Sequence, residues 1–250
     1  MALPPEVATA GALRVGTNVP YTPAEFKDTQ GRLVGVDIDL INAIATELGV
    51  TIQFTEWDFA DLIPSVRSGT LDVAMAAITD TKEREQVVDM VTYYSGGILW
   101  AQRAGPPINP DDACGLSVAV QATTIQQTDE LPARSNKCVA EGKAPIHILS
   151  FEGQDQAANA LLQGQADAVT ADSMVTAYMI KVSGGRLVPA GQMFDAAPMG
   201  WVVAKGSPLA LSLRQALERL IASGRYTKIL DKWGVGVGAI SNPQINAGIS

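Results

Sequence analysis

The spacing of apolar and polar residues along the first third of the chain predicts a series of short strands and helices. Residues 13–17 form a partly apolar run before a polar turn at 18–23, which is typical of a strand. Apolar residues then recur at helical spacing between Asp37 and Gly49, so a helix is expected there. The same reasoning predicts a strand at 51–54, a helix at 59–67 and a buried strand at 71–76. This βαβαβ order predicts a parallel sheet.

The second part of the chain repeats this plan after the proline-rich residues 106–110. The pattern predicts strands at 116–120, 146–149 and 166–170, and helices at 156–162 and after Asp172. The segment GTLDVA from Gly69 also matches GQADAV from Gly164. A strand at 201–204 and helices at 210–223 and 226–233 precede a glycine-rich tail. We expect two similar α/β lobes with a ligand cleft between them, because ligands bind at the carboxyl ends of open sheets and at domain interfaces.

Composition and charge narrow the class of protein. Of the 250 residues, 47% are hydrophobic and 18% charged, as in a globular protein. The 18 basic and 26 acidic residues give a net charge of −8 without a run of five like charges, so nucleic acid is not an expected partner. No apolar stretch approaches the ~20 residues of a membrane span, and the first residues lack the layout of a signal peptide. The chain is therefore expected to be soluble as given.

Cys114 and Cys138 are the two cysteines of the chain, and both lie in a polar region punctuated by Gly and Pro. A disulfide between them would close a local loop and indicate an oxidising compartment. The chain-entropy model gives such a loop roughly 3 kcal/mol. The alternative is two unrelated buried thiols. The polar flanking residues read as exposed, which favours the disulfide.

Four stretches together resemble a known family. They read LRVGTNVPYTP from Leu13, GVDIDL from Gly35, AAITDTKER from Ala76 and GQADAVTAD from Gly164. In this order and spacing the chain resembles, over nearly its whole length, solute-binding protein family 3, the periplasmic and extracellular amino-acid-binding proteins of polar amino-acid ABC transporters. A cysteine pair is also a feature of some members.

The resemblance implies an α/β, two-lobed periplasmic-binding-protein-like fold of type II, in which each lobe is a mostly parallel sheet flanked by helices. The first lobe would be discontinuous, residues 1–99 plus 198–250, and the second would be residues 100–197. Two hinge strands, near 99–103 and 193–197, would join the lobes.

The resemblance also implies a function without chemistry. Such a protein captures a small zwitterion in the periplasm or outside the cell and delivers it to an ABC transporter permease by lobe closure. An export signal or a lipid anchor would accompany this location. A monomer is expected, with no cofactor and no metal.

Arg84 and Thr79 are the residues that the resemblance assigns to the ligand's α-carboxylate. A guanidinium grips a carboxylate with a planar pair of donors, and a threonine hydroxyl with backbone N–H groups completes the hydrogen bonds. We expect Arg84 to lie in a loop that leaves a strand end. The alternative is that Arg84 pairs with Glu83, Glu85 or Asp89 on a solvated helix.

Asp172 is the matching candidate for the ligand's α-ammonium group, because a carboxylate buried in a cleft needs a cationic partner. Its alternative role is to cap the helix that follows it. Tyr21, Phe59 and Trp57 fall where the family places aromatic rings around the ligand, and such rings exclude water and attract an ammonium group. For these aromatic residues the alternative is ordinary core packing.

The remaining candidates act through the backbone or depart from the family pattern. The resemblance adds Ala77 and Ile78 to the ligand-binding set, Ala77 through its backbone alone. The family reads Gly-Thr-Thr where this chain has Thr123, Thr124 and Ile125, which adds Thr124 and Ile125 to the set, with the backbone N–H of Ile125 in place of a hydroxyl. Asn18 occupies a position where relatives that bind basic amino acids carry an acid. An uncharged amino acid is therefore the expected ligand.

Two other classes of function stay open. An enzyme on the same scaffold, such as a dehydratase, would need a general acid in the cleft, for which Glu25 and Glu56 are conceivable. The chain could also be the ligand-sensing domain of a membrane receptor. The single histidine, His147, reads as part of a strand and is expected to be structural.

Overall fold

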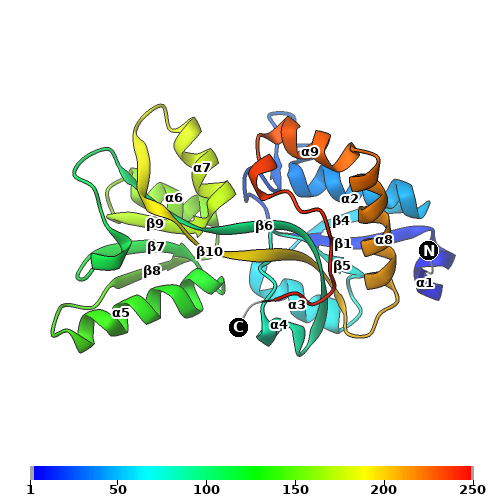
Figure 1. Cartoon of the computed structure of the whole chain (residues 1–250), viewed down its shortest axis with the longest axis horizontal. Coiled ribbons are helices and arrows are strands. Elements are labelled where there is room, and N and C mark those ends of the chain that lie inside the picture. The colour runs from blue at the N-terminus through cyan, green and yellow to red at the C-terminus, as the bar shows by residue number, and fades with distance from the viewer. Residues whose placement is uncertain (1–2, 249–250) are drawn as a thin grey trace. The chain divides into compact units, whose positions relative to one another are not determined.

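The computed structural model describes residues 3–248, which divide into two compact units (Figure 1). Unit 1 comprises the chain up to Val19, residues Pro23–Gly96 and the chain from Ala197 onward. Unit 2 comprises Pro20–Thr22 and Gly97–Ala196. Two long strands, β6 (Val88–Arg103) and β10 (Leu187–Ala204), each begin in one unit and end in the other.

Unit 1 contains a parallel sheet with helices around it. The strands of that sheet are β1 (Ala12–Thr17), β4 (Thr51–Glu56) and β5 (Val73–Ala74). Unit 1 also contains the short strands β2 (Phe26–Lys27) and β3 (Leu33–Val34), which pair with each other. Its helices are α1 (Pro5–Ala10), α2 (Val36–Leu48), α3 (Phe59–Arg67), α4 (Lys82–Glu85), α8 (Leu209–Ala222), α9 (Arg225–Trp233) and the 3-10 turn η3 (Gly236–Gly238). The parallel order is β4-β1-β5, and β10 joins β5 in the antiparallel sense.

The apolar pattern of the sequence forms the core of unit 1. The α2 residues Leu40, Ile41 and Ile44 are fully buried, as the helical spacing predicts. The helix ends at Gly49, whose φ of 71° lies in the left-handed region that glycine adopts without strain. On β1, Leu13 and Val15 are also fully buried.

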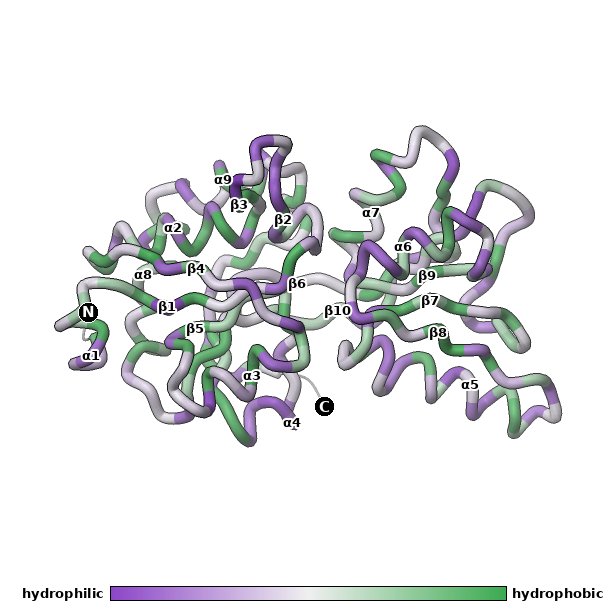
Figure 2. Tube along the Cα trace, turned by 180° about the vertical axis from the view of Figure 1, so that it is seen from behind, coloured by the Kyte–Doolittle hydropathy of each residue, from purple (hydrophilic) through white to green (hydrophobic). Residues whose placement is uncertain are grey.

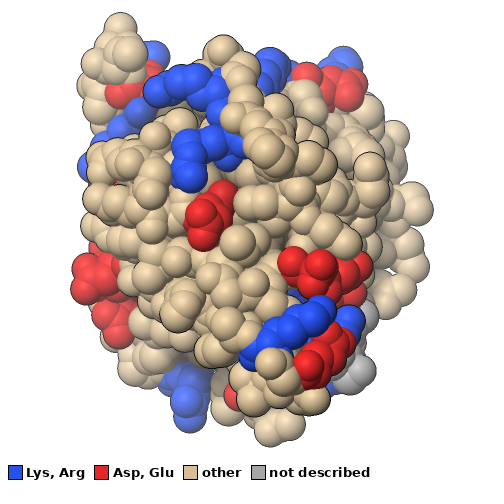
Figure 3. All heavy atoms as spheres, turned by 90° about the vertical axis from the view of Figure 1, so that its left-hand side faces the viewer, with Lys and Arg blue, Asp and Glu red and all other residues tan. Residues whose placement is uncertain are grey.

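Unit 2 has the same architecture. Its strands are β7 (Ser117–Gln121), β8 (His147–Phe151) and β9 (Ala168–Asp172), and its helices are α5 (Leu131–Ala140), α6 (Gln154–Leu162), α7 (Ser173–Val182), the 3-10 turn η1 (Pro110–Asp112) and the π-helical turn η2 (Gln126–Glu130). The parallel order is β8-β7-β9, and β6 joins β9 in the antiparallel sense. Figure 2 shows hydrophobic residues along β7 and a mixture of hydrophilic and hydrophobic residues along α5. On the face drawn in Figure 3, acidic and basic side chains lie in several small groups among neutral residues.

The fold class predicted from the sequence is confirmed. Each unit is a mostly parallel sheet flanked by helices, and the two predicted hinge segments belong to β6 and β10. The predicted strand at 201–204 is the last part of β10, which has 18 residues. The predicted strand at 71–76 is shorter, since β5 is Val73–Ala74. Within residues 3–248, no helix is both long and apolar enough to cross a membrane.

The disulfide between Cys114 and Cys138 is confirmed, with an S–S distance of 2.04 Å. Of the flanking residues expected to be exposed, Asp111, Asp112, Asn136 and Lys137 are exposed, whereas Ser135 is half-buried and Ala113 is buried. Cys138 lies on α5 and is 4% exposed, because it packs into the core of unit 2 beside Val118 and Leu131. The disulfide therefore ties α5 to the segment before β7.

Candidate functional site

Three residues of unit 1 that are predicted to bind the ligand follow three neighbouring parallel strands. Asn18 follows β1, Trp57 follows β4, and Ala77 lies three residues beyond β5. The order β4-β1-β5 places these positions at the same carboxyl edge of the sheet. The side-chain amide of Asn18 donates to the carbonyl of Trp57 at 2.8 Å, which ties two of the strand ends together. Such an edge is where open α/β sheets bind ligands.

Ala77 has a φ of 46°, which a residue with a β-carbon adopts at a cost. Its backbone N–H donates to Oδ2 of Asp37 at 3.1 Å. Ile78 and Thr79 follow it, and both are buried. The carbonyl of Ile78 accepts the N–H of Gly200 at 2.9 Å, and Thr79 forms a bridge with Met199 on β10. This turn is therefore fixed on both sides.

Arg84 lies beside Thr79 and Phe59 in unit 1. Its guanidinium donates to the carbonyl of Thr79 at 2.9 Å and lies 5.9 Å from the centre of the Phe59 ring. The prediction that Arg84 lies in a loop is wrong, because Arg84 belongs to the short helix α4, whose first turn is capped by Thr81. Two of the three acidic neighbours considered as partners pair with lysines: Glu85 with Lys82 and Asp89 with Lys205.

Trp57 and Phe59 pack against the core of unit 1 and remain partly exposed. The indole N–H of Trp57 donates to the hydroxyl of Thr55 at 2.8 Å. Core packing and an exposed ring face therefore occur together in these two residues. Their ligand role stays a prediction.

Asp172 ends β9 in unit 2 and is 6% exposed. Although it stands at the N-cap position of α7, its carboxylate forms no capping bond with the described backbone of that helix. It accepts hydrogen bonds from the hydroxyl of Tyr21 at 2.7 Å and from the side-chain amide of Gln126 at 3.0 Å. These donors offset part of the cost of burying a carboxylate.

The strand end after β7 has a second strained residue. Thr123 has a φ of 62°, and the hydroxyl of the buried Thr124 donates to the carbonyl of Gln121 at 2.8 Å. Ile125 precedes η2 and packs against the core. Residues held in such backbone conformations cluster at ligand sites. Ala77 in unit 1 and Thr123 in unit 2 both occur in predicted ligand-binding turns.

Gln126 is a residue that the sequence did not single out. It is 3% exposed and donates to the carboxylate of Asp172. Two glutamines in succession after Thr124 and Ile125 carry no distinctive pattern, so only its contact with Asp172 reveals it.

The buried Asp80, which follows Thr79 in the sequence, bonds the end of the described chain. Burial and the nearby charge of Glu85 raise the pKa of Asp80 to about 7. Asp80 accepts the N–H of Ala247 at 2.9 Å, and Glu85 accepts the N–H of Gly248 at 2.6 Å. The backbone N–H of Asn246 donates to the carbonyl of Met90, and the side-chain oxygen of Asn246 accepts the N–H of Met90. Residues 244–248 therefore run beside the first part of β6 and end beside Asp80 and Glu85.

The two conceivable general acids have other surroundings. Glu25 is fully buried, and its carboxyl group lies close enough to that of Asp37 to affect the pKa of Asp37. Glu56 lies at the surface in an ion pair with Lys27 at 2.6 Å. Among the described residues, no group of three or more His, Cys, Asp or Glu side chains is placed to hold a metal ion.

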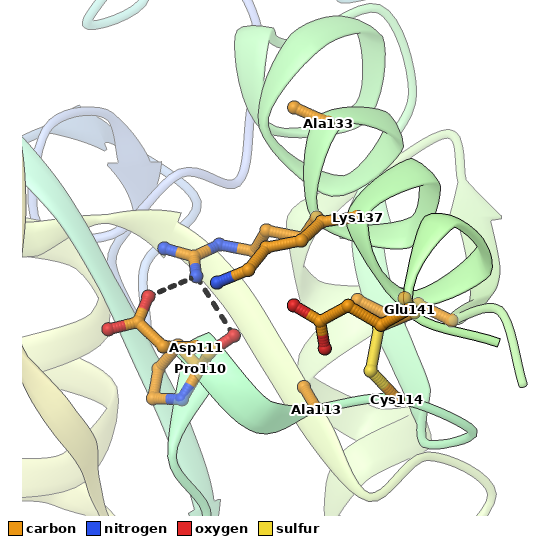
Figure 4. A pocket seen from close by; sticks show the side chains of 10 residues that line it. Pro110, Asp111, Ala113, Cys114, Ala133, Lys137 and Glu141 are labelled. Carbon is orange, nitrogen blue, oxygen red and sulfur yellow. Dashed lines mark hydrogen bonds and ion pairs between the residues drawn. A yellow bond between two sulfur atoms is a disulfide. The ribbon is translucent and has the colours of Figure 1, made fainter. Parts of the chain in front are cut away.

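A separate cavity of about 230 Å³ lies beside the disulfide in unit 2 (Figure 4). Its lining residues, all in the described part of the chain, are Pro110, Asp111, Ala113, Cys114, Ala133, Arg134, Lys137, Cys138, Glu141 and Ile146. The guanidinium of Arg134 bonds Asp111 and the carbonyl of Pro110, and it also pairs with Glu130. This cation is thus already held by two carboxylates, and the cavity contains no predicted ligand residue.

Comparisons with known proteins identify the family of the chain. The model of the bacterial extracellular solute-binding proteins, family 3, matches residues 13–236, and the chain belongs to this family. The chain is 42% identical over 246 residues to the arginine-binding protein ArgT of Corynebacterium glutamicum, covering 98% of this chain and 81% of that protein.

Solved structures show the same fold. An ancestral arginine-binding protein bound to arginine superimposes with a TM-score of 0.82 at 32% identity, covering 89% of this chain and 98% of the other. An ancestral arginine-binding protein bound to glutamine superimposes with a TM-score of 0.78 at 35% identity, covering 90% of this chain and 98% of the other.

Proposed function

We propose that this protein captures a free amino acid outside the cytoplasm and delivers it to the permease of an ABC importer. The observation that carries the proposal is a pair of opposite charges: Arg84 on α4 beside Thr79 in unit 1, and Asp172 at the end of β9 beside Tyr21 in unit 2. A guanidinium suits the ligand's carboxylate, and a buried carboxylate suits its ammonium group. The family membership supports the same role.

We propose L-arginine as the first ligand to test. Support comes from the relatives named for arginine, above all the one that is 42% identical over nearly the whole chain. The faces of Trp57 and Phe59 offer aromatic surface that attracts a guanidinium.

The second candidate is an uncharged amino acid such as glutamine. Asn18 favours it, because an amide supplies no negative charge for a cationic side chain. The structural relative that was solved with glutamine supports this alternative.

Isothermal titration calorimetry with arginine, lysine, histidine and glutamine tests the proposal. Arginine with a blocked amino group (N-acetylarginine) and with a blocked carboxylate (argininamide) are the matched controls. Binding of free arginine or glutamine with loss of both blocked forms is the expected result. If no free amino acid binds, or if the blocked forms bind as tightly as the free ligand, the proposal is wrong.

The delivery mechanism is part of the proposal. Lobe closure about β6 and β10, with residues 1–99 plus 198–250 as one lobe and 100–197 as the other, would give the permease a closed form to recognise. The protein would act as a monomer in the periplasm or at the cell exterior. Small-angle scattering with saturating ligand should show compaction, and an unchanged radius of gyration would contradict closure.

A further inference from the structure

The first turn of α2 holds a fully buried carboxylate directly behind the Ala77 turn. Asp37, the second residue of the helix, is fully buried. One of its oxygens, Oδ2, accepts two hydrogen bonds: the backbone N–H of Ala77 at 3.1 Å and the hydroxyl of Tyr93 at 2.7 Å. A buried carboxylate is costly, so a position that retains one invites a functional explanation.

Ala77 needs such a tether because of its backbone conformation. A residue with a β-carbon persists at a φ of 46° only where its surroundings force it to. The next two residues are already held by Met199 and Gly200. Asp37 therefore supplies the fixed point at the start of the turn, and β10 supplies the fixed point at its end.

The same helix end also holds the segment that follows Tyr21. The N–H groups of Val36 and Asp37 donate to the carbonyls of Pro23 and Ala24, each at 3.0 Å. The chain comes so close that a β-carbon at Gly35 would collide with the carbonyl of Ala24. These backbone bonds join the first turn of α2 to the chain that carries Tyr21.

Glu25 completes this arrangement. It is fully buried, and its carboxyl group lies near that of Asp37. The side chain of Asp37 is thus surrounded by an amide, a phenol and a second carboxyl group, each from a different segment of unit 1.

We infer that Asp37 is a positioning residue for ligand binding. Through the N–H of Ala77 it holds the turn that presents Ala77, Ile78 and Thr79 to the ligand's carboxylate. The inference rests on the proposed function, because it assigns Asp37 to the support of that same site. Asp37 itself does not touch the ligand.

The geometry provides a discriminating pair of variants. Since one oxygen accepts both bonds, an asparagine in Asp37→Asn retains them with its own carbonyl oxygen and offers its NH2 group to Glu25. Asp37→Ala removes the acceptor and leaves the N–H of Ala77 buried without it. Asp39→Ala is the matched control, because Asp39 lies on the same helix and bonds Lys232 and Trp233 at the surface.

Calorimetry with arginine and glutamine, together with thermal unfolding, tests the inference. Asp37→Ala should weaken the affinity of the bound amino acid by about tenfold or more, since a lost buried hydrogen bond disturbs the ligand-binding turn. Asp37→Asn should stay within about threefold of the parent. Asp39→Ala should lower the unfolding temperature without changing the affinity.

Hydrogen exchange at the Ala77 amide provides the second measurement and needs no ligand. This amide should be protected in the parent and in Asp37→Asn, and exposed to exchange in Asp37→Ala. If Asp37→Ala does not fold, Tyr93→Phe replaces it, with faster exchange at Ala77 and weaker binding expected.

The outcomes separate the two proposals. A parent protein that binds no amino acid overturns the proposed function and this inference with it. A parent that binds, with Asp37→Ala equal to the parent in affinity, overturns the positioning role alone. Equal losses in Asp37→Asn and Asp37→Ala also overturn it, because the hydrogen bonds to Oδ2 would then not be the cause.

Discussion

The hydroxyl of Tyr21 donates a 2.7 Å hydrogen bond to Oδ2 of Asp172, a residue 151 positions later in the sequence. Tyr21 belongs to the three-residue segment Pro20–Thr22, which groups with unit 2, whereas the chain on either side of it belongs to unit 1. The segment Pro20–Thr22 thus provides a hydrogen-bond donor, the hydroxyl of Tyr21, for the Asp172 carboxylate that we propose binds the ligand's ammonium group.

Tyr21→Phe should weaken binding of the amino acid by about tenfold, because a hydrogen bond to a buried charged group is lost while the ring remains. Calorimetry measures the affinity, and Tyr178→Phe on α7 is the control for removal of a hydroxyl group. Unchanged affinity in Tyr21→Phe would show that Asp172 does not depend on this donor.

Arg84→Ala should cost about 2–5 kcal/mol of binding free energy, because it removes the cation proposed for the ligand's carboxylate. Lys82→Ala removes a neighbouring charge that pairs with Glu85 and should leave the affinity unchanged. Near-normal binding in Arg84→Ala would remove Arg84 from the site.

Asp37 should make the stability of the protein depend on pH. Burial raises the pKa of Asp37 to about 6, above its ordinary value of 3.8, although Tyr93, Ala77 and Glu25 oppose the shift with hydrogen bonds. A raised pKa in the folded state gives a stabilisation that is present below pH 4 and lost as the pH rises through 6. The loss is about 3 kcal/mol.

Urea unfolding at pH 4.5 and pH 7.5 measures this dependence. Relative to Asp37→Asn, the parent should lose free energy of unfolding between the two pH values. Asp80, whose pKa is raised to about 7, is present in both proteins and cancels in the comparison. Parallel pH curves for the two proteins would mean that Asp37 does not titrate in this range.

Reduction of the disulfide, or replacement of both Cys114 and Cys138 by serine, should lower the free energy of unfolding by roughly 3 kcal/mol. Alkylation followed by mass spectrometry should find no free thiol in protein from an oxidising compartment. Because the predicted ligand residues lie elsewhere, the affinity for the amino acid should change little. A large loss of affinity would connect α5 to the site.

The regular elements of unit 1 were predictable because their signals are local. The helix α3 is found at the predicted residues, and α2 ends where Gly49 follows its apolar stripe. In contrast, α5 was missed, because its sequence LPARSNKCVA has few apolar residues at helical spacing. The length of β10 was missed as well, since Gly191, Asp195 and Pro198 interrupt its apolar pattern.

The site was predictable where the sequence carries a motif and hidden where it depends on long-range contacts. The resemblance drew attention to Thr79, Arg84 and Asp172. Nothing in the sequence joins Gln126 to Asp172 or Asp37 to Ala77, because each bond links residues about 40 positions or more apart. The expectation of an uncharged ligand came chiefly from Asn18, and relatives named for arginine make a cationic ligand the first to test.

Residues 244–248 affect how the protein should be handled as a reagent. They lie beyond the residues matched by the family model. The N–H groups of Ala247 and Gly248 donate to the carboxylates of Asp80 and Glu85, which precede and follow Arg84 in the sequence. A purification tag or a fluorescent reporter fused after Ser250 would pull on this segment. A fusion before α1 would instead join the edge of the unit 1 sheet where β1 begins, opposite the edge where Asn18 and Ala77 lie. For a biosensor based on this chain, attachment on the side of α1 is expected to leave the predicted ligand residues undisturbed.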